Sequence, residues 1–119
     1  MRADNQILID SKAFALRIIN LYRFLKDEKQ VYVLSKQVLR SGTSIGANVR
    51  ESVNAQSRMD FINKLNIALK EANETEYWLE LLHESGMLDD NQFGSIYDDC
   101  NKIVATLTKI IKTTKGSDK

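Results

Sequence analysis

The chain has 119 residues and a formal net charge of +1, which bounds it to a single domain over residues 1–119. It contains no proline, which favours long helices, and its only cysteine, Cys100, excludes an internal disulfide and favours a reducing compartment. The polar N-terminus lacks a signal sequence and no apolar run reaches the length of a membrane span, so we expect a cytoplasmic protein with no membrane role.

The first predicted helix is marked by an apolar stripe whose members recur at steps of three and four residues: Phe14, Ile18, Leu21 and Leu25. Ser11 is its expected N-cap. The second helix is expected from about residue 31 to residue 55, and its apolar face consists of Val31, Leu34, Val38, Ile45 and Val49.

The third helix has the clearest signals in the sequence. Ser57 and Asp60 have the spacing of a capping box, and Gly86 stands where a C-cap glycine belongs. Between them a heptad seam alternates steps of four and three: Phe61, Leu65, Ala68, Ala72, Thr75, Leu79 and Leu82.

The fourth helix is expected to begin at Asp89, with Gln92 as its capping partner, and to end in a frayed polar tail over residues 113–119. Its apolar stripe includes Cys100, which we expect to pack as a small apolar residue. Four helices joined by short connections predict an all-α fold, an antiparallel up-down-up-down four-helix bundle.

Residues 41–48 of the second helix, Ser-Gly-Thr-Ser-Ile-Gly-Ala-Asn, form a run that helix propensity disfavours. Each internal glycine costs about 1 kcal/mol relative to alanine, so we expect close approach of a neighbouring helix to offset it. The helical wheel places Ser41, Asn48 and Ser52 near the core face. A buried Asn48 must be hydrogen-bonded, and its expected role is to fix one register of the bundle or oligomer.

Two stretches together resemble a known family: Ser44–Glu51, with the sequence Ser-Ile-Gly-Ala-Asn-Val-Arg-Glu, and the heptad helix of residues 61–82. The chain resembles the four helix bundle protein family, also called the 23S ribosomal RNA intervening-sequence proteins, which is related to the accessory protein of diversity-generating retroelements. Ser44, Asn48 and Glu51 are the polar positions that carry the match. The family often has Pro where this chain has Gly46, and Gly where it has Ser52.

The resemblance implies a four-helix bundle that assembles into a ring of five subunits. Some relatives are encoded within ribosomal RNA intervening sequences, and a related family looks like an accessory factor for a reverse transcriptase. The resemblance therefore implies structured RNA or DNA, or a nucleic-acid enzyme, as a partner besides the chain itself.

Charge is unevenly spread along the chain. Residues 1–70 contain twelve Lys/Arg and six Asp/Glu, whereas residues 71–99 contain nine Asp/Glu and no Lys or Arg. The candidate nucleic-acid contacts are outward basic residues of the first two helices: Arg23, Lys26, Lys29, Lys36, Arg40 and Arg50. Such stripes track phosphates without reading sequence, although an ordinary solvated helix surface has the same composition. Aromatic residues interleave weakly with them, so a base-reading mode is not expected.

Apolar residues cover more of the third helix than one groove of a bundle can bury. Ile67, Trp78 and Leu81 flank its seam, and Leu16 and Ile19 fall on the outer side of the first helix. Such a surplus predicts an oligomer interface, with a loop or terminus covering it as the alternative. The charge division makes a head-to-tail contact between subunits electrostatically reasonable.

Glu80 and His83 have the Glu-x-x-His spacing of di-iron bundles, but that site needs two such motifs and this chain has one histidine. We expect no metal, no cofactor and no catalytic residues. The sequence thus favours a non-enzymatic, oligomeric, nucleic-acid-binding module. Its alternative is a protein-protein scaffold or adaptor without a nucleic-acid role.

Overall fold

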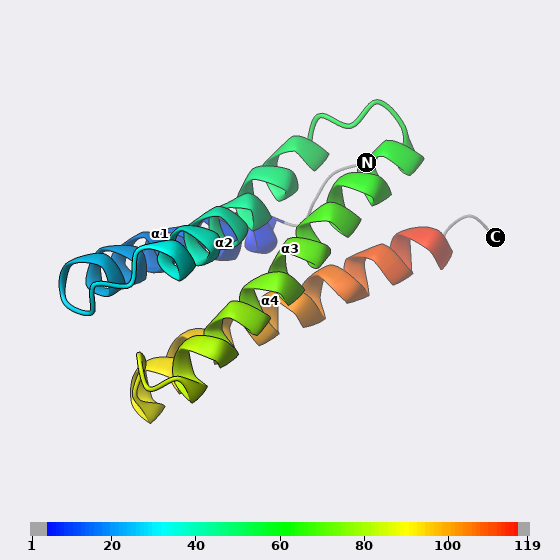
Figure 1. Cartoon of the computed structure of the whole chain (residues 1–119). Helices are drawn as coiled ribbons and strands as arrows, with labels where there is room; N and C mark the ends of the chain where they lie inside the picture. The colour runs from blue at the N-terminus through cyan, green and yellow to red at the C-terminus, as the bar shows by residue number, and fades with distance from the viewer. Residues whose placement is uncertain (1–4, 117–119) are drawn as a thin grey trace.

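The structure is a computed structural model that describes residues 5–116 as four helices. They are α1 (Asn5–Asp27), α2 (Val33–Ser52), α3 (Arg58–Glu84) and α4 (Asp90–Gly116). Successive helices pack against each other and α1 contacts α4, so the predicted all-α four-helix bundle is confirmed. The bundle measures 50 × 21 × 20 Å, with the α1–α2 and α3–α4 turns at one end and the α2–α3 connection at the other (Figure 1).

None of the four described helices combines the length and the apolar content that a membrane crossing requires.

The core is built from one buried stripe of each helix, as periodicity predicts. All seven seam positions of α3, from Phe61 to Leu82, are buried. The apolar ones among them meet Phe14 and Ile18 of α1, together with the apolar stripes of α2 and α4, in one buried cluster. Cys100 lies in this cluster, and its thiol lies 3.4 Å from the carbonyl oxygen of Ala72.

Both ends of α3 have the caps that the sequence predicts. Ser57 has extended backbone geometry, and its hydroxyl accepts a 3.0 Å hydrogen bond from the Asp60 backbone N–H. At the other end, the backbone N–H of Met87 donates to the Leu82 carbonyl at 2.9 Å, which closes a Schellman motif. This motif requires Gly86 at φ 84°, a conformation that side chains with a Cβ disfavour.

The start of α4 is also as predicted. The Asp89 and Gln92 side chains each accept a hydrogen bond from the other's backbone N–H, at 2.7 and 3.0 Å. The helix continues to Gly116 and so includes residues 113–116 of the tail for which fraying is predicted, while residues 117–119 lie outside the described part. The Thr114 hydroxyl donates to the carbonyl of Ile110 within this last turn.

The expected N-cap role of Ser11 is wrong. The α1 helix begins at Asn5 and already buries Ile7, so Ser11 lies inside the helix with 1% of its surface exposed. The contact between α1 and α2 explains why a small residue, Ser11, stands at this buried position. A Cβ at Gly46 would come within 3.2 Å of the Ser11 carbonyl oxygen, so the two helices approach here through their smallest residues.

A second close contact between α1 and α2 lies nearer their turn. A Cβ built on Gly42 would come 2.7 Å from Cγ1 and 2.8 Å from Cγ2 of Ile18. Ile18 is fully buried. The interpretation of the two internal glycines as sites of helix approach is therefore confirmed.

Candidate nucleic-acid interface

The outward face between α1 and α2 holds three of the six predicted basic residues: Lys26, Lys36 and Arg50. It is lined on α1 by one stripe at steps of three and four: Leu8, Lys12, Ala15, Ile19, Tyr22 and Lys26. On the other side it is lined by Tyr32, the residue directly before α2, and by five residues of α2: Lys36, Leu39, Thr43, Gly46 and Arg50. We call this pair of stripes the outer seam. Neither stripe contains an acidic residue.

Half of the outer seam forms an open groove of about 700 Å³. Its floor is made of small residues, including Ala15 and Gly46, because α1 and α2 approach closely there. Lys12 and Arg50 stand at its rim, and Ile9 adds a side chain that is 60% exposed. The groove thus combines apolar walls with positive charge at its edge.

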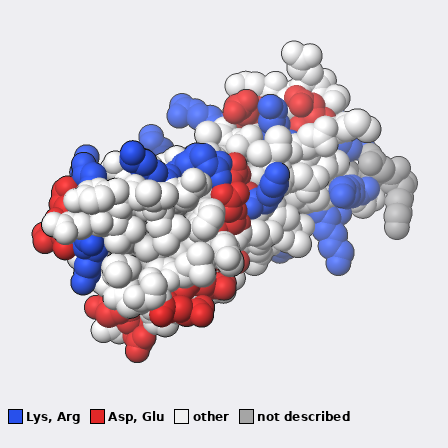
Figure 2. Space-filling model, viewed as in Figure 1, with Lys and Arg blue, Asp and Glu red and all other residues white. Residues whose placement is uncertain are grey.

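The cations of the outer seam are mostly without a partner among the described residues. Lys12, Lys36 and Arg50 are exposed, and no ion pair there engages them. Lys26 lies 3.9 Å from an Asp27 carboxylate oxygen, a distance typical of a weak surface pair. Figure 2 shows Lys and Arg side chains along the upper edge of the α1–α2 half, with acidic side chains gathered below on the α3–α4 turn.

Two further predicted contacts lie beside the seam at the α1–α2 turn. Arg23 is exposed on α1, one turn before Lys26. Lys29 is exposed in the connection, with its Nζ 5.8 Å from the centre of the Phe24 ring. Both add positive charge to this end of the hairpin, where Asp27 and Glu28 offset part of it.

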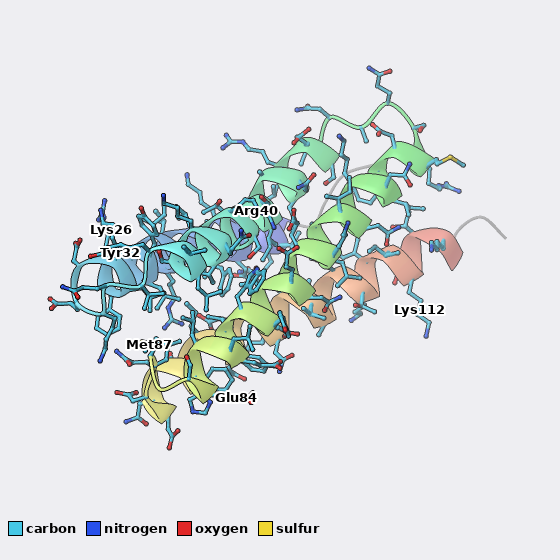
Figure 3. All side chains as sticks on the ribbon, in the orientation of Figure 1. Lys26, Tyr32, Arg40, Glu84, Met87 and Lys112 are labelled. Atoms are coloured by element: carbon cyan, nitrogen blue, oxygen red, sulfur yellow. The ribbon has the colours of Figure 1, made fainter. Side chains whose placement is uncertain are left out.

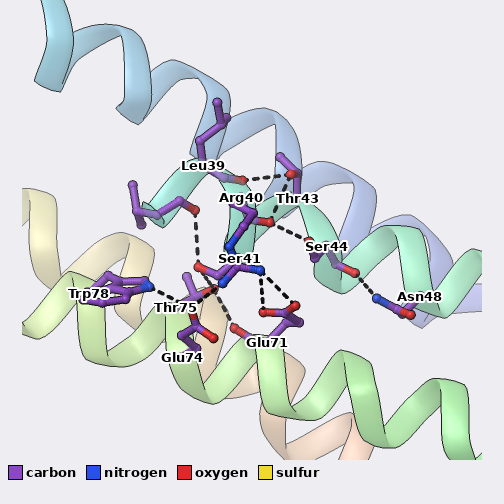
Figure 4. A network of polar contacts seen from close by, with 11 residues as sticks. Leu39, Arg40, Ser41, Thr43, Ser44, Asn48, Glu71, Glu74, Thr75 and Trp78 are labelled. Carbon is purple, nitrogen blue, oxygen red and sulfur yellow. Dashed lines mark hydrogen bonds and ion pairs between the residues drawn. The ribbon is translucent and has the colours of Figure 1, made fainter. Parts of the chain in front are cut away.

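Arg40 differs from the other predicted contacts because it is engaged within the fold. Its guanidinium pairs with Glu71 at 3.2 Å and with Glu74, so it ties α2 to α3. Hydrogen bonds to Glu71 and then Glu74 raise the pKa of Arg40 above its ordinary value. The Trp78 indole donates to Glu74 at 3.2 Å and completes this network (Figure 4). Any contact of Arg40 with nucleic acid has to compete with these carboxylates.

The predicted structural polar residues lie on α2 between this network and its C-terminus. The Ser44 hydroxyl donates to the Arg40 carbonyl at 2.6 Å, and Glu51 pairs with Lys64 at 3.4 Å. Asn48 is half-buried rather than buried, and its amide donates to the Ser44 carbonyl on the same helix at 2.9 Å. The expectation of a buried Asn48 is therefore wrong.

The buried polar link between helices involves other residues. Thr75 Oγ1 of α3 lies 2.9 Å from Ser41 Oγ of α2, and both side chains are fully buried. Sequence placed both positions on core faces but did not pair them, because their pairing depends on the relative rotation of two helices.

The predicted oligomer surface is partly exposed. Leu16 is 57% exposed on α1 and Ile67 is 43% exposed on α3. Ile19, Trp78 and Leu81 are half-buried, and Trp78 also packs against the core. The structure adds Tyr77, 54% exposed beside Trp78, to this apolar surface.

The Glu80–His83 pair serves the α3–α4 contact. Glu80 accepts a 2.8 Å hydrogen bond from the Tyr97 hydroxyl, which raises the pKa of Tyr97 to about 12. His83 Nε2 lies 2.7 Å from an Asp90 carboxylate oxygen, and its ring stacks on Phe93. Within residues 5–116 no group of three or more His, Cys, Asp or Glu side chains is placed to hold a metal ion.

Comparison with known proteins places this helical bundle in a family. The model of the family described as 23S rRNA-intervening sequence protein matches residues 3–109. The chain belongs to this family. It is 59% identical to a protein of unknown function from the S23 ribosomal protein family of Bacteroides thetaiotaomicron, whose crystal structure matches with a TM-score of 0.90. That match covers 91% of this chain and 96% of the other. No curated protein matches the chain.

Sequence reasoning missed two aromatic residues of the outer seam in this member of the 23S rRNA-intervening sequence protein family. Lys12 was recognised as an outward basic residue of the first helix, and the structure places it with Arg50 along one groove. Tyr22 and Tyr32 were not counted as part of the basic surface. Their signal is present in the sequence, because each tyrosine stands four residues before a lysine, at Lys26 and Lys36.

Proposed function

We propose that the protein is a non-enzymatic homo-oligomer that binds nucleic acid, RNA foremost, through the outer seam. The observation that carries this proposal is charge: four Lys/Arg and no acidic residue occupy the two stripes. A surface of this kind attracts phosphates, and releasing condensed counterions supplies most of the binding free energy. The 23S rRNA in the family description is in keeping with an RNA partner.

Oligomerisation is the second part of the proposal. Leu16, Ile67 and Tyr77 each expose 43% or more of their surface in one chain, and such apolar exposure is typical of subunit contacts. The family resemblance favours five subunits. A ring repeats the outer seam, so several weak phosphate sites act on one RNA and raise the affinity through effective concentration.

The proposed setting is the cytoplasm, and the proposal assigns no reaction and no cofactor to the protein. The competing function is a scaffold that uses the same exposed apolar residues for a different protein partner. The exposed Met59 at 73% and Ile67 at 43%, both on α3 and away from the outer seam, favour this second function as the alternative.

Binding to a fluorescein-labelled structured RNA, followed by anisotropy across a salt series, tests the nucleic-acid part. If each seam cation of one subunit neutralises one phosphate, log Kd rises with log salt with a slope of about 3 to 4. Charge reversal of Lys36 and Arg50 to Glu weakens binding to all sequences alike. Arg40 is unsuited to this test, because a carboxylate there would face Glu71 and Glu74.

The matched control is reversal of Lys109 and Lys112, two exposed lysines on α4 outside the seam. An equal loss of affinity in both double variants contradicts a role for the outer seam. No binding of the unmodified protein to any RNA or DNA at low salt rejects the nucleic-acid function and leaves the scaffold.

A further inference from the structure

The turn end of the outer seam carries two tyrosine–lysine pairs, one on each helix. On α1, Lys26 Nζ lies 5.4 Å from the centre of the Tyr22 ring, within the range of a cation–π contact. At the start of α2, the N-cap residue Tyr32 is 56% exposed, and Lys36 follows one helical turn later, also exposed. The two pairs offer aromatic faces next to positive charge.

Both pairs lie at the same end of the hairpin because the connection folds back onto α1. The Val31 backbone N–H donates to the Leu25 carbonyl at 2.9 Å, so α2 begins beside the last turn of α1. Figure 3 labels Lys26 and Tyr32 at this end of the molecule and Arg40 further along α2. The seam therefore presents aromatic rings at the turn, whereas no aromatic residue lines the groove.

Tyr32 contributes little to folding where it stands. It occupies the N-cap position of α2 and gives the helix no side-chain cap. Serine, threonine, aspartate or asparagine is the residue type that stabilises a helix at this position. Within the described residues, the Tyr32 hydroxyl makes no hydrogen bond and its ring forms no aromatic pair or cation–π contact. Its exposed ring is therefore available to stack on a base.

The rings and the cations together select a particular form of nucleic acid. The rise from Lys12 to Lys26 along α1 is about 21 Å, enough for several consecutive phosphates. Bases in a duplex are already stacked on each other and keep their faces from protein side chains. An unpaired strand offers those faces, and stacking on aromatic side chains tolerates any sequence.

We propose that the outer seam binds an unpaired nucleic-acid strand, with Tyr32 stacking on a base and Lys12, Lys26, Lys36 and Arg50 contacting its phosphates. This inference rests on the proposed nucleic-acid function and specifies its ligand. Tyr22, half-buried beneath Lys26, holds that lysine over the strand's path. In a structured RNA, this surface binds the loops and single-stranded segments.

The test compares a ten-nucleotide labelled RNA of mixed sequence with a duplex of the same sequence, using anisotropy at fixed low salt. The unmodified protein binds the single strand more tightly than the duplex. Tyr32→Ala weakens single-strand binding about tenfold and leaves duplex binding unchanged, whereas Tyr32→Phe retains affinity because the ring remains. Val33→Ala, which shortens an exposed apolar side chain next to Tyr32 but removes no ring, has no effect.

The outcomes separate this inference from the function on which it rests. Equal binding of both forms, or unchanged single-strand binding by Tyr32→Ala, overturns the unpaired-strand inference while the nucleic-acid function stands. Absence of binding to either form rejects both. If Tyr32→Ala instead lowers the mass measured by light scattering, a second copy of the chain covers the seam and the inference is overturned.

Discussion

Alanine substitution at two glycines provides a matched test of the packing between α1 and α2. Gly42 and Gly94 both lie inside long helices, so replacing either with alanine gains about 0.5–1 kcal/mol in helix propensity. At Gly94 nothing lies within 4 Å of the new Cβ, and the gain is expected in full. At Gly42 the new Cβ meets three atoms of the Ile18 side chain at 2.7, 2.8 and 3.0 Å.

The clash at Gly42 outweighs its propensity gain. Ile18 is fully buried and branched at Cβ, so it has no free rotamer to adopt, and overpacking of this kind costs about 1–3 kcal/mol. The expected net effect is a loss of about 1 kcal/mol for Gly42→Ala against a gain of about 0.5–1 kcal/mol for Gly94→Ala. In a domain of this size, 1 kcal/mol corresponds to a Tm change of about 4 °C.

Urea unfolding followed by circular dichroism measures both variants, together with a double-mutant cycle through Ile18→Ala. Removing the three clashing atoms of Ile18 creates room, so Gly42→Ala is expected to become stabilising in that background. The reasoning is refuted if Gly42→Ala is as stable as Gly94→Ala in the otherwise unmodified chain. It is also refuted if Ile18→Ala leaves the cost of Gly42→Ala unchanged.

Three further predictions concern burial, polar links and assembly. One carboxylate oxygen of Glu76 is buried and has no hydrogen-bond partner among the described residues. Desolvation, and then the Glu80 carboxylate, raise the pKa of Glu76 above its ordinary value of 4.5. The folded state therefore binds the Glu76 proton more tightly than the unfolded state does, and the free energy of unfolding falls as pH rises from 4.5 through the folded pKa. Glu76→Gln is expected to reduce this pH dependence in urea titrations and to stabilise the protein at pH 7. Thr75→Val leaves the buried Ser41 hydroxyl without its inter-helix partner and is expected to lower the free energy of unfolding by about 1–2 kcal/mol. An unchanged urea midpoint would show that this hydrogen bond does not stabilise the fold. Light scattering is expected to show an oligomer, with five subunits preferred, and a stable monomer at micromolar concentration contradicts this expectation.

Local patterns predicted the helices well because their causes lie within a few residues of each other. The seam of α3 from Phe61 to Leu82 and the Asp89 cap of α4 depend on spacings of three and four residues. Ser11 shows the limit of such signals. A serine suits both a helix cap and a close helix contact, and only the position of Gly46 on α2 decides between them.

The candidate site was less predictable because it depends on how helices face one another. The sequence identified Lys36, Arg40 and Arg50 as outward basic residues, and Lys36 and Arg50 are open to solvent. The rotation of α3 about its axis brings Glu71 and Glu74 to Arg40, and no local pattern specifies that rotation. The grouping of Lys12 with Arg50 likewise depends on the register between α1 and α2.

The most direct test of the central claim is the salt dependence of RNA binding by the unmodified protein and by the Lys36→Glu, Arg50→Glu double variant. The account predicts measurable affinity at low salt that falls steeply as salt rises. It also predicts a large loss in the seam variant, with Lys109→Glu, Lys112→Glu as the unaffected control. Affinity that is independent of salt, or equal in the two double variants, would contradict binding through the outer seam.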